Sequence, residues 1–307
     1  MKLLILTQKV AQDDPILGFF HCWLIQFAKH YEQVSVICLG KGTYSLPSNV
    51  RVYSLGKEER KSKLTYLWRF YKYIWSLKGE YDAVFVHMNQ EYVLLGWKSW
   101  RLLGKPIYLW RNHAQGNFFT RLAVMFSRKV FYTSPQSYTA RFKKAVQMPV
   151  GIDTDFFKPN PNVTRQPHTI LFLGRIAPVK KVLEFVEWFN TLEPEFIATV
   201  AGEALSKDQA YAIEVRKKAS DRIKFIGPVT QVEALKLYQS HELYVNKTPA
   251  GSFDKTIFEA AACETKLLLG NQDLKFLESK SDSELRQFVI EHHSLTLLMG
   301  KLQRALS

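Results

Sequence analysis

Short apolar segments alternate with helical patterns along the whole 307-residue chain, and this alternation limits its fold more than any other feature. The apolar segments are rich in Leu and β-branched residues, as in KLLILT (2–7) and DAVFVH (82–87). They are continuous and do not alternate with polar residues, which is typical of parallel strands buried on both faces. The pattern therefore predicts an α/β protein with doubly wound parallel sheets.

The pattern restarts after a polar, proline-containing segment, KPNPNVTRQPH (158–168), so we expect two domains. At about 150 residues per domain, each is long enough to bury its own core. We expect one domain over 1–158, a second over 159–290, and a C-terminal helix over 291–307 that packs back on the first. Ligands of such sheets bind at the carboxyl ends of the strands, which places the site in a cleft between the domains.

One further helix is predicted from the segment SPQSYTARFKKA. A serine at 134 is suited to cap a helix, and the following Pro135 is suited to its first position. We therefore expect a helix that starts at Ser134.

Positive charge is concentrated in the first half of the chain. The whole chain has 42 Lys and Arg against 28 Asp and Glu, a formal net charge of +14. Residues 1–160 contain 23 basic and 10 acidic side chains, whereas residues 161–307 contain 19 and 18. This asymmetry indicates that the first half faces an anionic partner, either a membrane leaflet or nucleic acid. A generally basic soluble protein is the alternative, but it would not explain the nearly neutral second half.

The segment 61–78, KSKLTYLWRFYKYIWSLK, is the expected membrane contact. Its aromatic side chains suit the headgroup boundary, and its Lys and Arg attract anionic lipid. One aromatic face will be core, but the aromatics lie all round the predicted helix, so a single core face cannot hide them all. The same mixture suits RNA, but the sequence has no RNP-type or KH-type signature, so no nucleic acid is expected.

The remaining composition points to the cytoplasm. No window reaches 18 apolar residues free of charge, and the first apolar run has only four residues, so neither a transmembrane helix nor a signal peptide is expected. The three isolated cysteines form no CxxC pair, which fits a reducing compartment without disulfides or a metal site.

The segment LFLGRIAPVKKVLEF (171–185) is the first candidate binding motif. A strand ends at Gly174, Arg175 follows in a loop, and Lys180 is predicted in the first turn of the next helix. Glycine allows close backbone approach, and a helix N-terminus attracts anions. Arg175 and Lys180 could converge on a diphosphate, or they could be solvated surface charges. Neither GxGxxG nor a P-loop GKS/T motif is present.

The segment PAGSFDKTIFEAAACE (249–264) is the second candidate motif. Ser252 or Asp254 could cap a helix that contains Lys255 and Glu259. The helix start with its lysine predicts a second anion site. Glu259 could accept hydrogen bonds from ribose hydroxyls, or it could only complement the helix dipole.

Together these motifs resemble the retaining GT-B glycosyltransferases of the family 4 type, also called group 1. VGIDTDFFKP (150–159) resembles the family's inter-domain segment, LGRIAPVKKV its donor-phosphate loop, and GSFDKTIFEAAAC its nucleotide-sugar helix. WRNHAQG places a histidine after a strand, where the family has an active-site histidine, and DDPILGFFHCW resembles its acceptor loop. The resemblance implies two Rossmann-like domains that face each other across a cleft.

The resemblance also implies the reaction and its residues. A hexose would move from a UDP- or GDP-sugar with retained configuration and without an obligatory cofactor or metal. The implied catalytic residues are His113, Arg175, Lys180 and Glu259, although His113 could instead be a core histidine. The implied donor-binding residues are Gly174, Arg175, Lys180, Gly251, Ser252, Phe253, Asp254, Lys255, Thr256 and Glu259. Gly18 and His113 would lie on the acceptor side.

The sequence departs from the family pattern at two positions. Gly251 stands where the family usually has its first glutamate, eight residues before Glu259, and Asp254 replaces a common glycine. The donor-sugar contact of that glutamate would have to come from backbone N–H groups of 252–255 or from Asp254.

We therefore expect a glycosyltransferase that is peripheral on the inner face of the cytoplasmic membrane and acts in cell-envelope polysaccharide biosynthesis. Its acceptor would be a membrane-associated or lipid-linked glycan. One alternative is a nucleotide-sugar epimerase of the same fold, which would not need the basic, aromatic first half. A second is a non-catalytic nucleic-acid-binding or scaffold protein.

Overall fold

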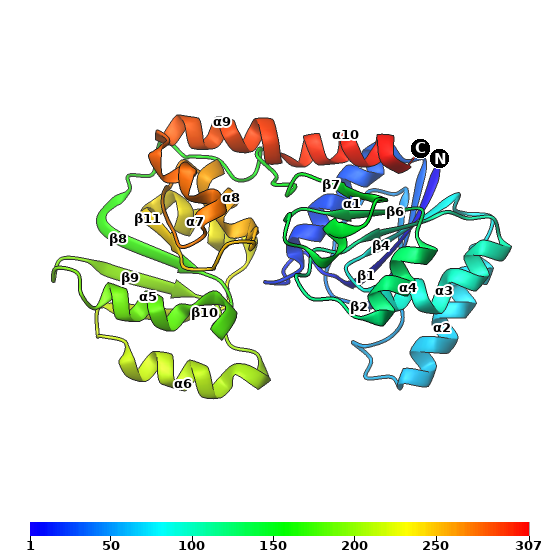
Figure 1. The fold of residues 1–307 in the computed structure, drawn as a ribbon, viewed down its shortest axis with the longest axis horizontal. Coiled ribbons are helices and arrows are strands. Elements are labelled where there is room, and N and C mark those ends of the chain that lie inside the picture. Colours follow the sequence, from blue (N-terminus) through cyan, green and yellow to red (C-terminus); the bar gives the residue numbers. More distant parts are fainter. Residues whose placement is uncertain (307) are drawn as a thin grey trace. The chain divides into compact units, whose positions relative to one another are not determined.

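The computed structural model describes residues 1–306, which form two compact units (Figure 1). Unit 1 comprises Met1–Pro149 together with the residues from Leu298 on, and unit 2 comprises Val150–Leu297. The segment that follows Pro149 belongs to unit 2 because Val150, Ile152 and Phe157 are buried in its hydrophobic core.

Unit 1 is built on a seven-stranded sheet in which every neighbouring pair is parallel. The strand order is β3-β2-β1-β4-β5-β6-β7. The strands are β1 (Lys2–Val10), β2 (Gln33–Lys41), β3 (Val50–Ser54), β4 (Ala83–His87), β5 (Ile107–Trp110), β6 (Lys129–Tyr132) and β7 (Ala145–Gln147). The chain reverses its direction across the sheet between β1 and β4, which are neighbours at its centre.

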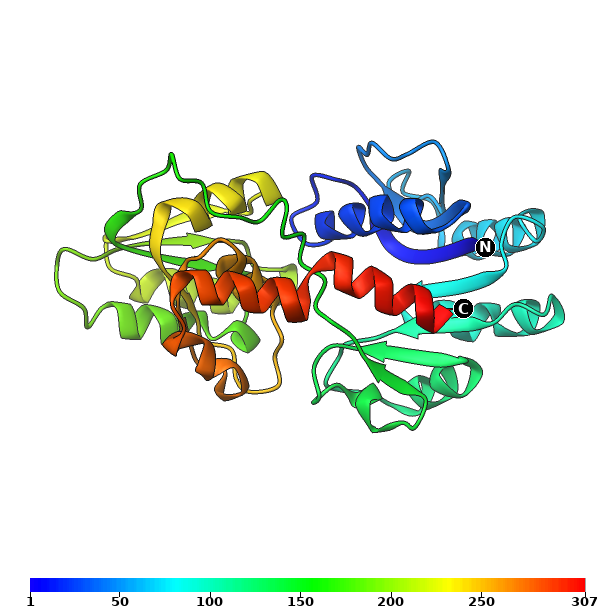
Figure 2. The same ribbon diagram turned by 90° about the horizontal axis from the view of Figure 1, so that it is seen from above.

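Helices cover both faces of this sheet. They are α1 (Gly18–His30), α2 (Lys63–Ser76), α3 (Gln90–Leu102), α4 (Phe118–Phe126) and α10 (Leu295–Leu306). The Tyr108 hydroxyl donates a hydrogen bond to the Leu306 carbonyl oxygen at 3.2 Å, and the Trp110 ring packs at 5.0 Å from Trp23 of α1. Alternate residues of a strand share a face, so α1 and α10 cover one face, the nearer one in Figure 2.

The other face of the sheet packs against α2, α3 and α4. Leu109, which lies between Tyr108 and Trp110, is buried in a core with Phe70 of α2, Trp100 of α3 and Val124 of α4. Figure 1 shows these helices as a row of neighbours.

The prediction of a helix that starts at Ser134 is wrong. The structure has only a short 3-10 turn, η1 (Tyr138–Arg141). The Asn112 side-chain oxygen accepts hydrogen bonds from the backbone N–H groups of Thr133 and Ser134, at 3.1 and 3.0 Å, and from the Ser137 hydroxyl at 2.6 Å. These long-range bonds satisfy the backbone in a loop conformation, so the serine does not start an α-helix.

Unit 2 is built on a five-stranded parallel sheet in the order β10-β9-β8-β11-β12. The strands are β8 (Gln166–Leu173), β9 (Ile197–Ala201), β10 (Ile223–Gly227), β11 (His241–Asn246) and β12 (Lys266–Leu269). The helices are α5 (Val182–Phe189), α6 (Gln209–Lys218), α7 (Gln231–Ser240), α8 (Lys255–Ala262) and α9 (Asp282–His293). One core lies under α5 and α6, and a second lies under α7, α8 and α9, so unit 2 is also doubly wound.

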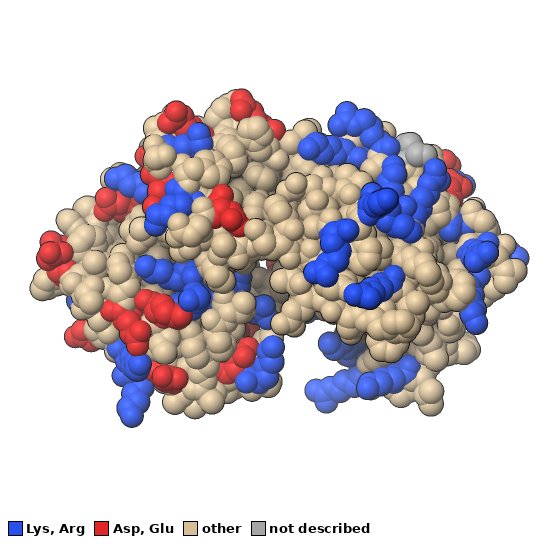
Figure 3. Space-filling view, in the orientation of Figure 1, with Lys and Arg blue, Asp and Glu red and all other residues tan. Residues whose placement is uncertain are grey.

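The charge asymmetry is visible on the surface. Among the charged residues on the face drawn in Figure 3, those of unit 1 are mostly Lys and Arg, whereas those of unit 2 are of both signs. Across residues 1–306, none of the helices combines the length and the apolar character that crossing a bilayer would need.

Candidate active site

The candidate site of unit 2 lies where its chain reverses direction across the sheet. Strands β8 and β11 are neighbours, and the chain leaves them toward opposite edges. Ligands of open α/β sheets bind outside the carboxyl ends of the strands at such a point. The segments that follow these strands lead into α5 and α8, whose N-termini present the positive ends of two helix dipoles. In the first turn of α5, the Leu183 N–H already donates to the Tyr211 hydroxyl at 2.9 Å. Both sequence motifs therefore meet at one edge of the sheet.

In the loop after β8, the backbone of Gly174 packs directly against Gly202, at a distance that leaves no room for a side chain on Gly202. The Gly174 N–H donates to the Ala201 carbonyl oxygen at 2.9 Å. A Cβ atom on Gly202, whose φ is +138°, would lie 2.0 Å from the Gly174 carbonyl oxygen. Arg175 follows Gly174 and is partly exposed.

Lys180 lies outside the helix in which it was predicted. It ends a 3-10 turn, η2 (Pro178–Lys180), and Lys181 then takes a left-handed conformation with φ 54° before α5 begins. The turn and the left-handed residue place Lys180 ahead of the helix, so this part of the prediction is wrong.

Lys180 is paired with a residue from the second motif. Its Nζ lies 2.5 Å from Oδ1 of Asp254, and the two side chains are only 19% and 15% exposed. Asn246 Nδ2 donates to the other carboxylate oxygen at 3.3 Å, and the Ser252 hydroxyl donates to Oδ1 at 3.3 Å. Asp254 is the N-cap residue of α8, but its side chain makes no capping hydrogen bond. An anion that reaches Lys180 must therefore compete with this carboxylate.

The other residues of the second motif mostly stabilise the loop and the start of α8. The Gly251 N–H, at φ +84°, donates to an Asp273 carboxylate oxygen at 2.8 Å. Three more predicted residues make internal contacts: the Phe253 ring packs 5.9 Å from Phe258, Lys255 Nζ donates to the Gly151 carbonyl oxygen at 3.0 Å, and Thr256 Oγ1 accepts from the Tyr244 hydroxyl at 2.7 Å.

Glu259 is buried, with 7% of its surface exposed. The Tyr238 hydroxyl donates to its carboxylate at 3.2 Å. Burial raises the pKa of Glu259, and the positive charge of Lys255 offsets part of this effect. A ribose contact from this carboxylate stays a prediction.

The two predicted acceptor-side residues both lie at the carboxyl edge of the unit 1 sheet. Gly18 is the first residue of α1, is buried, and donates its N–H to the Asp14 carbonyl oxygen at 2.8 Å. His113 follows β5 and is exposed, so it is not a core histidine. Its Nδ1 accepts a hydrogen bond from the Gln115 N–H at 3.0 Å, which orients the ring.

Asn246 is a site residue that sequence reasoning missed. It ends β11 and is 3% exposed, and its amide donates to Tyr244 at 3.2 Å as well as to Asp254. Its side-chain oxygen accepts from the backbone N–H and the hydroxyl of Thr248. A polar residue at the carboxyl end of a buried strand, as in LYVNK, is the signal that could have identified it.

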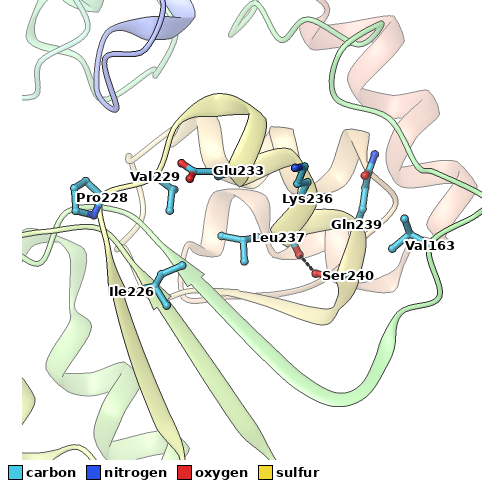
Figure 4. Close-up of a pocket in the computed structure, with 9 residues that line it drawn as sticks. All are labelled: Val163, Ile226, Pro228, Val229, Glu233, Lys236, Leu237, Gln239 and Ser240. Atoms are coloured by element: carbon cyan, nitrogen blue, oxygen red, sulfur yellow. Dashed lines mark hydrogen bonds between the residues drawn. The ribbon is translucent and has the colours of Figure 1, made fainter.

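A cavity of about 510 Å³ lies elsewhere in unit 2 and contains none of the predicted residues (Figure 4). It lies beside α7, and its lining is Val163, Ile226, Pro228, Val229, Glu233, Lys236, Leu237, Gln239 and Ser240. The Glu233 carboxylate already accepts a hydrogen bond from the Thr230 N–H at 2.7 Å, as part of the capping box at the start of α7. Within the described chain, no three His, Cys, Asp or Glu side chains are grouped to hold a metal ion.

Comparison with known proteins identifies a family for the part of the chain that contains both motifs. The family model described as glycosyl transferases group 1 matches residues 153–307. A search of curated proteins found no match.

Several solved structures share the fold over nearly their whole length. Anabaena Alr3699/HepE in complex with UDP-glucose has a TM-score of 0.75 at 15% identity, covering 100% of this chain and 99% of that one. A glycosyltransferase from Rickettsia africae has a TM-score of 0.72 at 15% identity, covering 99% and 98%. Sucrose-phosphate synthase from Thermosynechococcus elongatus has a TM-score of 0.67 at 13% identity, covering 100% and 94%. The α/β fold predicted from the sequence is therefore confirmed as that of the GT-B glycosyltransferases.

Proposed function

This chain belongs to the glycosyl transferases of group 1, and we propose that it transfers a hexose from a UDP-sugar to a lipid-linked glycan at a membrane surface. We further propose that it is of the family 4 type, retains the anomeric configuration and acts in the cytoplasm on a cell-envelope precursor. A UDP-sugar is the favoured donor because Anabaena HepE, which has the same fold, was solved with UDP-glucose.

The donor site is supported by one observation: the segments 171–185 and 249–264, each of which contains lysine, come into contact where the unit 2 chain reverses direction across the sheet. Lys180 follows β8, Asp254 precedes α8, and their side chains are in contact. When the bond from the sugar to the diphosphate breaks, negative charge grows on the leaving phosphate. Arg175 and Lys180, with the N-termini of α5 and α8, would stabilise that charge, so the proposed reaction needs no metal ion.

The observation that supports the membrane contact is the apolar surface of α2. Phe70 and Ile74 point into the core, whereas Leu64 is 79% exposed and Trp68 is 61% exposed. Lys72 Nζ lies 4.9 Å from the centre of the Trp68 ring, so a cation borders the exposed aromatic. Such a surface suits an anionic headgroup region.

The two neighbouring helices also have exposed apolar side chains. Leu102 of α3 is 78% exposed, and Phe118, Phe119 and Met125 of α4 are exposed as well.

A thermal-shift screen of nucleotide-sugars tests the donor assignment. A UDP-sugar at 100 times its Kd should add about 2.7 kcal/mol to the free energy of unfolding. Lys180→Ala should lose most of this shift, whereas Lys207→Ala, an exposed lysine elsewhere in unit 2, should keep it. If no UDP- or GDP-sugar raises the melting temperature, the proposed function is wrong.

Vesicle co-sedimentation tests the membrane assignment. Three exposed lysines, Lys63, Lys72 and Lys78, are changed to Gln; Arg69 is left because it already pairs with Glu59 at 3.1 Å. At about 1 kcal/mol per charge, binding to anionic vesicles should weaken by up to about 3 kcal/mol.

The matched control changes the exposed unit 2 lysines Lys207, Lys217 and Lys224, which removes the same charge. Equal loss of vesicle binding in both triple variants would show that net charge alone, and not α2, is responsible.

A further inference from the structure

The positive charge of unit 1 is not spread evenly along the chain. Residues 92–149 contain ten Lys and Arg and no Asp or Glu, and this stretch includes β5, β6, β7 and α4. Helix α10, which completes the unit, also has no acidic residue. Since these elements offer no carboxylate that could neutralise the charge, this part of unit 1 is suited to an anionic ligand.

Two segments that follow neighbouring strands lie together at the carboxyl edge of this part of the sheet. Residues 111–117 follow β5, and residues 133–141, which end in η1, follow β6. The Tyr138 N–H donates to the His113 carbonyl oxygen at 2.9 Å, and a Cβ atom on Gly116 would lie 2.2 Å from the Tyr138 ring. The two segments therefore pack closely, at the edge where sheets of this kind bind ligands.

Three arginines are gathered at Tyr138, whose side chain is buried. Arg121 of α4 donates from Nε to the tyrosine hydroxyl at 3.0 Å, and the Arg141 guanidinium lies 4.2 Å from the centre of the ring. Arg111 donates to the His113 carbonyl oxygen at 3.4 Å, the same atom that accepts the Tyr138 N–H. Contacts with one tyrosine and its backbone thus bring three guanidinium groups together.

No carboxylate neutralises this arginine cluster. Among residues 1–306, no ion pair includes Arg111, Arg121 or Arg141. Burial lowers the pKa of Arg111, and the negative charge of Glu91 on α3 offsets part of this effect without pairing with it. Arg121 and Arg141 are exposed, so a ligand can reach them. Three positive charges match a phosphate group, which carries about −1.5 to −2 at pH 7, better than they match a single carboxylate.

An exposed aromatic side chain lies next to the cluster. Phe118 precedes Arg121 by three positions on α4, which puts both on the same side of the helix, and Phe118 is 67% exposed. An apolar side chain beside a cationic one suits a phosphate that is joined to a hydrocarbon group.

We propose that Arg111, Arg121 and Arg141 bind a phosphate or diphosphate group of the acceptor. Arg121 and Arg141 contact the phosphate oxygens, and Arg111, which is half-buried, adds positive charge. This inference rests on the proposed function, of which it specifies the acceptor: the glycan that receives the sugar carries a phosphate, and unit 1 recognises that phosphate.

Calorimetric titration of the purified full chain with inorganic pyrophosphate tests the arginine cluster. The titration uses the Lys180→Ala background, in which the Asp254 carboxylate has lost its countercharge and repels anions from the unit 2 site. Saturable binding is expected. It should weaken at least tenfold in Arg121→Gln/Arg141→Gln and at least threefold in Arg141→Gln alone.

The matched control is Arg101→Gln/Arg128→Gln, which removes the same charge from unit 1. Both arginines are exposed and line a cavity with Ile107, the first residue of β5, so they lie at the opposite edge of the sheet. The control should bind pyrophosphate within threefold of its parent protein. Melting curves check the fold of each variant. Because Arg121 is bonded to a buried tyrosine, the exposed Arg141 gives the single variant that disturbs the structure less.

Absence of saturable binding would overturn the inference. Equal losses in the two double variants would also overturn it, since net charge alone would then be responsible. Geranyl diphosphate distinguishes the two sources of the phosphate, and either result supports the cluster. Tighter binding than pyrophosphate, with the gain lost in Phe118→Ala, indicates a lipid-linked acceptor, whereas equal affinity indicates a water-soluble phosphorylated one.

The UDP-sugar thermal shift, measured with Lys180 intact, separates this inference from the proposed function. A shift without pyrophosphate binding at the cluster overturns only the acceptor inference. Pyrophosphate binding that depends on Arg121 and Arg141, without a UDP-sugar shift, overturns the transferase assignment and leaves a phosphate site on unit 1.

Discussion

Replacing Asp254 by asparagine should make the protein bind UDP more tightly. The substitution keeps the shape of the side chain but removes the negative charge that lies 2.5 Å from Lys180 Nζ. In the unliganded protein this carboxylate neutralises the lysine, and a diphosphate must displace it or share the lysine with it. The asparagine variant presents an uncompensated ammonium to the ligand.

The size of the effect follows from the geometry. A phosphate charge on the far side of the ammonium would lie about 5 Å from the carboxylate, where like charges repel by about 3 kcal/mol at an effective dielectric constant of 20. Solvent and rearrangement reduce this, so a net gain of about 1–3 kcal/mol, or roughly 5- to 150-fold in Kd, is expected. The free protein should lose stability, because one partner of a mostly buried ion pair is left without its countercharge.

Calorimetric titration with UDP measures the change. Glu187→Gln is the matched control, because Glu187 also pairs with a lysine of unit 2, Lys218, at 2.8 Å. Its UDP affinity should equal that of the unchanged protein, and Lys180→Ala should abolish the gain in the double variant. A folded Asp254→Asn protein that binds UDP tenfold more weakly would refute the reasoning, since Asp254 would then contact the ligand favourably.

Three other predictions follow from the site. Arg175→Ala and Lys180→Ala should each lower kcat by roughly 100-fold, about 3 kcal/mol of lost charge stabilisation. Arg175→Ala should change the melting temperature little, whereas Lys180→Ala should lower it, because the mostly buried Asp254 carboxylate loses its countercharge. Gly202→Ala should reduce the free energy of unfolding by about 2–3 kcal/mol in urea titrations and weaken UDP binding, because its Cβ would meet the Gly174 carbonyl oxygen. Burial raises the pKa of Glu259, so the stability of the unchanged protein relative to Glu259→Gln should fall as pH rises above the ordinary value of 4.5 and through the raised pKa. Urea unfolding of both proteins at pH 4, 6 and 8 measures this difference, and a constant difference would contradict it.

The fold class could be predicted because it depends on local patterns. Continuous apolar strands such as 82–87 are visible in the sequence, and the structure has β4 there. The missing helix at Ser134 could not be predicted, because the bonds that hold this loop come from Asn112, more than twenty residues earlier.

The candidate donor site was predictable to the level of segments and not to the level of contacts. The sequence shows where the buried strands end, and ligands of open α/β sheets bind outside those ends. The partner of Lys180 is Asp254, which is 74 residues away in sequence, and no spacing rule connects them. The short turn that places Lys180 before α5 depends on the left-handed Lys181, a conformation that lysine seldom adopts.

The discontinuity of unit 1 has a consequence for the synthesis of the protein. Tyr108 and Lys129 are bonded to the Leu306 and Ala305 carbonyl oxygens of α10, so one face of the first sheet is completed by residues made nearly 200 positions later. Residues Met1–Pro149 therefore emerge from the ribosome before α10 is made, so the apolar side chains that α10 covers are still exposed. Val150–Leu297, in contrast, is one continuous segment, so all the residues of unit 2 are present once it has emerged. The nascent first half must stay soluble without its last helix, and a chain truncated before Leu298 should aggregate during expression.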